Sequence, residues 1–120
     1  MSKSEIKFGK WAEKMFKGAF IQKVSDFKQL GHGGNKGMPD FLIIKDGIHL
    51  WYEVKYVKSL KTFNFKEINE NQWIMFAKML KKGGKDVILA IYDGQFKLHL
   101  KYYSELLNMR LNGGKKWVFG

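Results

Sequence analysis

The N-terminal segment carries apolar side chains at the spacing of one helical face. Between residues 4 and 17 they stand three and four positions apart: Phe8, Trp11, Ala12, Met15 and Phe16. This spacing predicts an amphipathic helix, for which Ser4 is the candidate N-cap. Residues 19–29 predict a strand of mixed character, and the glycine-rich run at residues 31–37 predicts a loop.

A hairpin is expected next in the chain. Residues 40–45 and 48–55 are rich in apolar side chains, and Asp46-Gly47 between them is a strong signal for a two-residue turn of type I′. A loop that carries several lysines is expected to follow over residues 56–66.

The second half of the chain predicts, in order, a helix over 67–82, strands over 86–92 and 95–101 on either side of Asp93-Gly94, a helix over 104–111 and a tail. The element order is therefore αβββαββα. It predicts one domain over residues 1–120, of the α/β or α+β class, in which helices flank a mixed sheet.

The hairpin determines which side chains face each other. If Asp46-Gly47 forms a two-residue loop, Lys45 faces Ile48 and Asp40 lies opposite Glu53. Opposite side chains share a face, with Cβ atoms about 4.5–5.5 Å apart. Lys55 is expected on the same face, because side chains alternate along a strand.

Two carboxylates at that distance repel each other, so a cation is expected between them. A divalent ion such as Mg²⁺ prefers oxygen ligands and shares them with water and phosphate. Lys55 can hold a phosphate oxygen or orient a metal-bound water. The alternative is a surface hairpin in which Asp40 caps a turn and Glu53 forms an ordinary ion pair.

Charge narrows the class of partner. The chain has 22 Lys and Arg against 11 Asp and Glu, a formal charge of +11, which favours nucleic acid as the partner and an anionic membrane surface as the second choice. A small basic protein whose lysines only solvate it is the alternative. Cysteine is absent, so disulfides and thiolate metal sites are excluded. No signal-like or membrane-spanning apolar run is present, and we expect a soluble, cytoplasmic protein.

Pro39-Asp40 followed by Glu53-Val54-Lys55 resembles the PD-(D/E)xK signature of the restriction-endonuclease-like nucleases. On the first helix, the run from Gly9 to Glu13 is similar to the G-x-x-x-E of Holliday-junction resolvases. The stretches at 52–55, 59–65 and 68–72 look like those of RecU-type resolvases and their phage relatives. The approach GHGGNKGMPD at residues 31–40 is more similar to the VRR-type nucleases.

The resemblance implies a restriction-endonuclease-like core and a DNA endonuclease that uses Mg²⁺, with Mn²⁺ as a substitute, to resolve Holliday junctions or other branched DNA in recombination. A phage origin and a homodimer would fit it. Asp40, Glu53, the Val54 carbonyl and Glu13 would hold the metal, with Glu5 as the rival of Glu13. Lys55 would activate the attacking water or stabilise the phosphate.

Gln72 is a polar residue on the apolar stripe of the second predicted helix. It would position a metal-bound water or a phosphate, or else it would only cap the helix three positions after Asn69. Lysines and a histidine in the loops around the motif strands are candidate nucleic-acid contacts: His32, Lys36, Lys58 and Lys61.

Two other functions stay open at this point. One is a VRR-like nuclease that acts on flaps or nicks. The other is a non-catalytic nucleic-acid-binding protein with the same fold. Metal-dependent cleavage of DNA would separate the nucleases from the binding protein.

Overall fold

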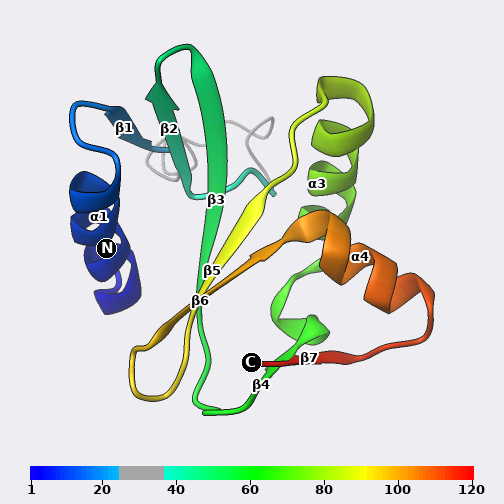
Figure 1. Ribbon diagram of the computed structural model, residues 1–120. Coiled ribbons are helices and arrows are strands. Elements are labelled where there is room, and N and C mark those ends of the chain that lie inside the picture. The colour runs from blue at the N-terminus through cyan, green and yellow to red at the C-terminus, as the bar shows by residue number, and fades with distance from the viewer. Residues whose placement is uncertain (25–36) are drawn as a thin grey trace.

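A mixed five-stranded sheet forms the centre of the computed structural model, which describes residues 1–24 and 37–120 (Figure 1). In spatial order its strands are β1 (Phe20–Lys23), β2 (Phe41–Lys45), β3 (Ile48–Tyr56), β5 (Ile88–Tyr92) and β6 (Leu98–Tyr102). β3 and β5 are parallel, and the other neighbouring strands are antiparallel. The parallel pair is possible because the chain between β3 and β5 includes a long crossover with a helix.

Helices cover both faces of this sheet. Helix α1 (Lys3–Met15) lies on one face, and α3 (Glu70–Gly83) and α4 (Tyr103–Leu111) lie on the other (Figure 1). The eight elements of the main body follow the order α1-β1-β2-β3-α3-β5-β6-α4. The predicted order αβββαββα and the α/β class are therefore confirmed.

A second, two-stranded sheet was not expected. β4 (Thr62–Asn64) pairs antiparallel with β7 (Lys116–Val118), and the 3₁₀ turn η2 (Phe65–Glu67) follows β4. The predictions of a plain loop and a plain tail are wrong here. Each strand has only three residues and its partner lies at the far end of the sequence, so no local pattern marks the pairing.

The helix starts differ from the sequence prediction because of capping. Ser2, not Ser4, caps α1, where its hydroxyl accepts a hydrogen bond from the Glu5 N–H, while Ser4 is buried inside the helix. α3 begins at Glu70 and not at 67, because Asn69 caps it. β1 confirms the first part of the strand expected over 19–29. Val24 already lies in a turn, and residues 25–29 of that strand and 31–36 of the glycine-rich run lie outside the described residues.

The turn between β5 and β6 is wider than the Asp-Gly signal suggested. One carboxylate oxygen of Asp93 accepts hydrogen bonds from the N–H groups of Gln95 and Lys97, at 2.8 and 3.0 Å. These bonds hold the backbone in a broader turn, so β6 begins at Leu98 and not at Gln95.

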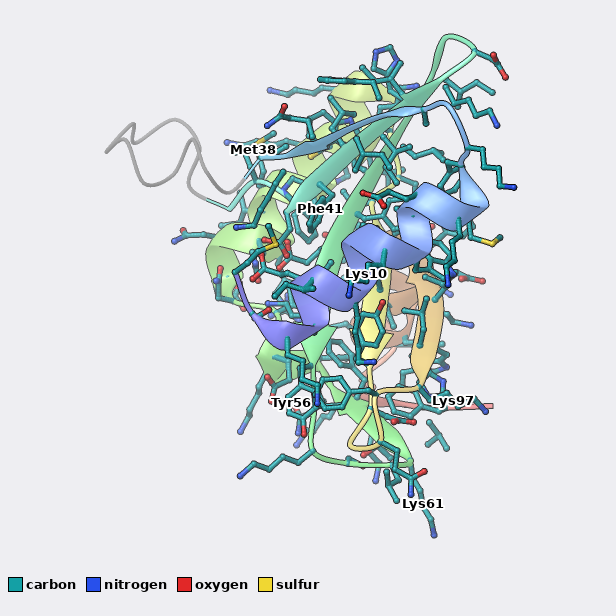
Figure 2. All side chains as sticks on the ribbon, turned by 90° about the vertical axis from the view of Figure 1, so that its left-hand side faces the viewer. Lys10, Met38, Phe41, Tyr56, Lys61 and Lys97 are labelled. Atoms are coloured by element: carbon teal, nitrogen blue, oxygen red, sulfur yellow. The ribbon has the colours of Figure 1, made fainter. Side chains whose placement is uncertain are left out.

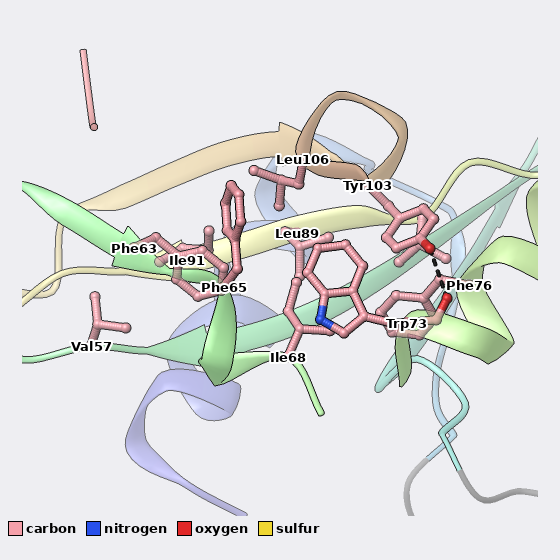
Figure 3. Packing of buried hydrophobic residues seen from close by; sticks show 11 residues of the cluster. Val57, Phe63, Phe65, Ile68, Trp73, Phe76, Leu89, Ile91, Tyr103 and Leu106 are labelled. Carbon is pink, nitrogen blue, oxygen red and sulfur yellow. Dashed lines mark hydrogen bonds between the residues drawn. The ribbon is translucent and has the colours of Figure 1, made fainter. Parts of the chain in front are cut away.

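The alternation of side chains along β3 divides the molecule into two cores. Tyr52 and Val54 pack in the core beneath α1, while the opposite face carries a larger core beneath α3, α4 and the small sheet. In that larger core the Tyr103 hydroxyl donates to the Trp73 carbonyl oxygen at 2.7 Å (Figure 3). The face of β3 that carries Glu53 therefore meets α3. No helix within the described residues is both long and apolar enough to cross a membrane.

Candidate active site

Asp40 lies directly before β2 and is fixed to both neighbouring strands. Its backbone carbonyl accepts a hydrogen bond from Val24 N–H at 2.7 Å, and its side-chain Oδ2 accepts one from Val54 N–H at 2.9 Å. The hairpin has the predicted register, from Lys45 facing Ile48 to Phe41 facing Tyr52. The paired register ends at Phe41 and Tyr52, and beyond it the Asp40 side chain is placed by its hydrogen bond from Val54 N–H, the residue after Glu53.

Glu53 is a buried carboxylate, with 3% of its surface exposed. Its Oε2 accepts a hydrogen bond from Gln72 Nε2 at 2.8 Å and lies 3.4 Å from Lys55 Nζ. A buried carboxylate needs such donors, because losing water without replacement is costly. Glu53 therefore belongs to a polar cluster beneath α3 and not to an exposed surface hairpin.

Gln72 connects the hairpin to α3. Its Oε1 accepts hydrogen bonds from Lys55 Nζ at 3.0 Å and from the Asn69 N–H at 3.1 Å, and its own N–H donates to Asn69 Oδ1 at 2.9 Å. The side chain thus completes a capping box and at the same time bridges Lys55 and Glu53. The capping interpretation of Gln72 is therefore confirmed, and its role in positioning a metal-bound water or a phosphate stays a prediction.

The approach to Asp40 is packed against the first turn of α3. Gly37 has φ +84°, and a Cβ at this position would lie 2.7 Å from the Asn71 carbonyl oxygen. Only glycine fits so close to the helix backbone. Pro39, which follows, is fully buried. These contacts place Asp40 on the same side of the molecule as Gln72.

The acidic residues of α1 lie on the other face of the sheet. Glu13 is exposed, and its contribution to the site stays a prediction. Glu5 forms an ion pair with Lys23 at 3.4 Å, and Lys23 pairs in the sheet with Phe41, the residue after Asp40. Glu13 lies eight residues further along the helix, about 12 Å at the usual rise. Of the two rivals, Glu5 is thus placed at the end of α1 where Asp40 lies.

Glu5 is also electrostatically distinct. Burial alone would raise the pKa of its carboxyl group, but hydrogen bonds from Ser2 and the nearby Lys23 ammonium lower it overall. Glu5, Glu13 and Lys23 line a common cavity of about 350 Å³ between α1 and β1. Glu5 is therefore held as an anion near the start of β2.

Of the predicted nucleic-acid contacts, the structure describes Lys58 and Lys61, and their role stays a prediction. Lys58 and Lys61 are exposed in the connection after β3. Lys61 lies far from Met38 and Phe41, the labelled neighbours of Asp40 (Figure 2). His32 and Lys36 lie outside the described residues. Sequence reasoning missed the ion pair between Glu5 and Lys23, for which no local pattern gives a signal.

The donors of the cluster suit a hard divalent cation. Asp40 and Glu53 supply carboxylate oxygens. The Val54 carbonyl oxygen points to the same side of β3 as the Val54 N–H group, which donates a hydrogen bond to Asp40 Oδ2. Mg²⁺ commonly binds one or two protein carboxylates and completes its shell with water and phosphate oxygens. Among residues 1–24 and 37–120, no three His, Asp or Glu side chains are grouped to hold a metal. Two carboxylates and a carbonyl oxygen are the donor types of a Mg²⁺ ion that keeps water and phosphate oxygens in its shell.

Mg²⁺ or Mn²⁺ should raise the melting temperature of the protein, because a ligand of the folded state stabilises it by about 2.7 kcal/mol at 100 times its Kd. Asp40→Asn should remove most of this gain, since the amide keeps an acceptor for Val54 N–H but loses the charge. Asp46→Asn is the matched control, because it removes an exposed carboxylate from the turn of the same hairpin. Thermal unfolding with and without millimolar metal measures the effect. Equal gains for both variants would contradict the site.

Comparison with known proteins supports the fold. No protein-family model and no curated protein sequence matches the chain. Among solved structures, the chain is similar to Hjc, a Holliday junction resolvase from the archaeal hyperthermophile Archaeoglobus fulgidus. The TM-score is 0.59 at 16% identity, over 83% of this chain and 74% of Hjc. The chain therefore shares the fold of Hjc. The fold that the motif resemblance implied is confirmed.

Proposed function

We propose that this protein is a metal-dependent endodeoxyribonuclease, acting as one domain over residues 1–120, that cuts four-way junctions or related branched DNA. The observation that carries the proposal is the contacting set of Glu53, Lys55 and Gln72, with Asp40 bound to the backbone N–H of Val54 between Glu53 and Lys55. A structural ion pair would need only Glu53 and Lys55. The further carboxylate and the bridging amide suit phosphodiester hydrolysis.

Asp40, Glu53 and the Val54 carbonyl would hold Mg²⁺, with Mn²⁺ as a substitute. A carboxylate of α1 would support them through water, and the placement of Glu5 favours it over Glu13. When bound, the metal would polarise the scissile phosphate and generate the nucleophile from water. The buried position of Glu53 would keep its carboxylate aimed at this ion.

Lys55 would act on the phosphate or on the attacking water. Its ammonium lies 3.0 Å from Gln72 Oε1 and 3.4 Å from Glu53 Oε2, so it is held in one place before substrate arrives. A charge fixed in advance stabilises a developing negative charge without reorganisation during the reaction. Gln72 is accordingly a positioning residue for both Lys55 and Glu53.

DNA is the partner that the charge supports, because a formal charge of +11 attracts a polyanion. The likeness to a junction resolvase supports a branched substrate over a linear one. Resolution of a four-way junction needs two cuts related by symmetry, so we further propose that two copies act together. Light scattering of the protein with a junction measures this stoichiometry.

The proposed function predicts metal-dependent cleavage with a preference for branched DNA. We would compare a four-way junction, a flap, a nicked duplex, a linear duplex and a single strand of matched sequence, each with Mg²⁺, Mn²⁺ or chelator. The junction should be cut fastest, and the products should carry 5′-phosphates. Faster cutting of the flap or the nicked duplex would favour the VRR-like function. Binding without cleavage of any substrate would leave a non-catalytic DNA-binding protein.

A further inference from the structure

Four lysines lie in one row on the outer side of α1. Lys3, Lys7, Lys10 and Lys14 are all exposed, and at about 100° per residue they fall within an arc of roughly 60°. The row extends about 16 Å along the helix. Figure 2 shows Lys10 on the outer surface of α1. Glu5 and Glu13 do not interrupt this α1 lysine row, because they fall on other sides of the helix.

An aromatic ring stands beside the N-terminal half of the row. The Phe96 ring stacks on Tyr56, with ring centroids 4.9 Å apart. The ammonium groups of Lys3 and Lys7 lie 4.3 and 5.7 Å from the centre of the same ring. Cations gather over aromatic faces because of the ring quadrupole. The Phe96 ring therefore brings the ammonium groups of Lys3 and Lys7 close to each other.

Phe96 occupies a backbone position that is unfavourable for its residue type. Its φ of 59° lies in the left-handed region, where a bulky side chain is an outlier and glycine is not strained. Strain of this kind persists where the surrounding structure imposes it, and it is enriched at binding sites. The backbone of the turn favours glycine at position 96, so the contacts of the ring explain why a phenylalanine stands there.

A groove of about 300 Å³ runs between the lysine row and the β5–β6 hairpin. Lys7, Lys10 and Lys14 line it with their charged side chains, and its remaining lining is aromatic or aliphatic: Trp11, Tyr92, Phe96 and Leu98. A cationic rim above an apolar floor suits a sugar–phosphate backbone, in which phosphates meet ammonium groups and deoxyribose rings cover apolar surface.

We propose that the α1 lysine row and this groove bind the sugar–phosphate backbone of a DNA arm other than the one that is cut. The proposal rests on the proposed function and adds a second DNA-binding surface to it. α1 and α3 cover opposite faces of the sheet, so the row and the cluster around Gln72 lie on different sides of the molecule (Figure 1). A branched DNA offers arms in several directions and can therefore meet both surfaces.

The test compares two triple variants of equal charge, both made in the Asp40→Asn chain so that DNA is not cut. One carries Lys7→Gln, Lys10→Gln and Lys14→Gln. The control carries the same change at three exposed lysines of α3: Lys78, Lys81 and Lys82. Circular dichroism checks the fold of each. Fluorescence anisotropy with a labelled four-way junction then measures affinity across a range of salt concentrations.

We expect the α1 triple variant to bind the junction roughly tenfold or more weakly at 0.1 M salt, and its log–log salt slope to fall by about 2–3, because each lost phosphate contact removes about 0.9. The α3 triple variant should change neither quantity by a comparable amount. Equal losses in both would overturn the proposal, since only net charge would then matter. If the parent chain binds no junction, the proposed function itself fails.

Two further measurements test the surface independently. Phe96→Gly removes no charge and relieves the left-handed backbone, yet it should weaken junction binding several-fold without changing the salt slope. Unchanged affinity would overturn the role given to the ring. Vesicles with phosphatidylserine test an anionic membrane as the occupant. The proposal would also be overturned if the α1 triple variant lost vesicle binding but kept the junction affinity of its parent chain.

Discussion

Lys55→Ala should lower the rate of metal-dependent junction cleavage by about 10²–10³, because loss of one preorganised charge or donor typically costs that much. The protein should still fold, since the Lys55 side chain reaches the surface and its main buried contacts are with Gln72 and Glu53. Metal binding and junction affinity should be largely kept. Single-turnover cleavage of a four-way junction, after binding is shown to be equal, measures the effect.

Lys55→Arg is the control that separates charge from geometry. A guanidinium keeps the positive charge but presents a planar fork of donors in place of a compact ammonium, so it cannot reproduce the contacts of Lys55 with Gln72 and Glu53. We therefore expect little recovery of cleavage. Lys66→Ala is the second control, because it removes an exposed lysine of η2 to which no role is assigned. Full activity in Lys55→Ala would exclude the proposed chemistry and leave Lys55 as a partner of Glu53 alone.

Gln72→Glu should destabilise the protein by roughly 3 kcal/mol at pH 8, because it replaces the donor 2.8 Å from the buried Glu53 carboxylate by another acceptor. The helix start should survive, since Glu is a standard residue at the third position of a capping box. The loss would thus come from repulsion beside Glu53. Urea denaturation at several pH values measures it.

The sign of the pH dependence follows from the two carboxylates. In the folded variant their repulsion raises the pKa of one of them above its unfolded value of about 4.3. The folded state then binds more protons than the unfolded state above that pH, so stability falls as pH rises. The loss in free energy of unfolding relative to wild type should be small near pH 4 and should reach its full value near pH 8.

The exchanged pair is the decisive control for this prediction. Glu53→Gln together with Gln72→Glu restores one amide and one carboxylate in reversed positions. This double variant should regain most of the lost stability, because the donor and acceptor match again. It should still fail to cleave, since the carboxylate no longer projects from β3. A double variant as unstable as Gln72→Glu would show that the lost stability does not come from the pairing of residue 72 with residue 53.

The sequence by itself determined the elements of the main body and the register of the hairpin. Local signals were sufficient there: the helical spacing around Phe8 and the Asp46-Gly47 turn act over a few residues. Once that turn is fixed, period-two alternation places Asp40, Glu53 and Lys55 without further information. The basic composition and the motif around Asp40 then indicated a nuclease.

Only the tertiary structure decided which distant groups meet this face. The contact between Gln72 and Glu53 depends on how α3 crosses the sheet, and residue spacing cannot specify that crossing. The same holds for the pairing of β4 with β7, and for Glu5, which reaches Lys23 because α1 packs on the opposite face. The physical reason is range. Turns, caps and periodicity are encoded over a few residues, whereas these contacts depend on the packing of whole elements.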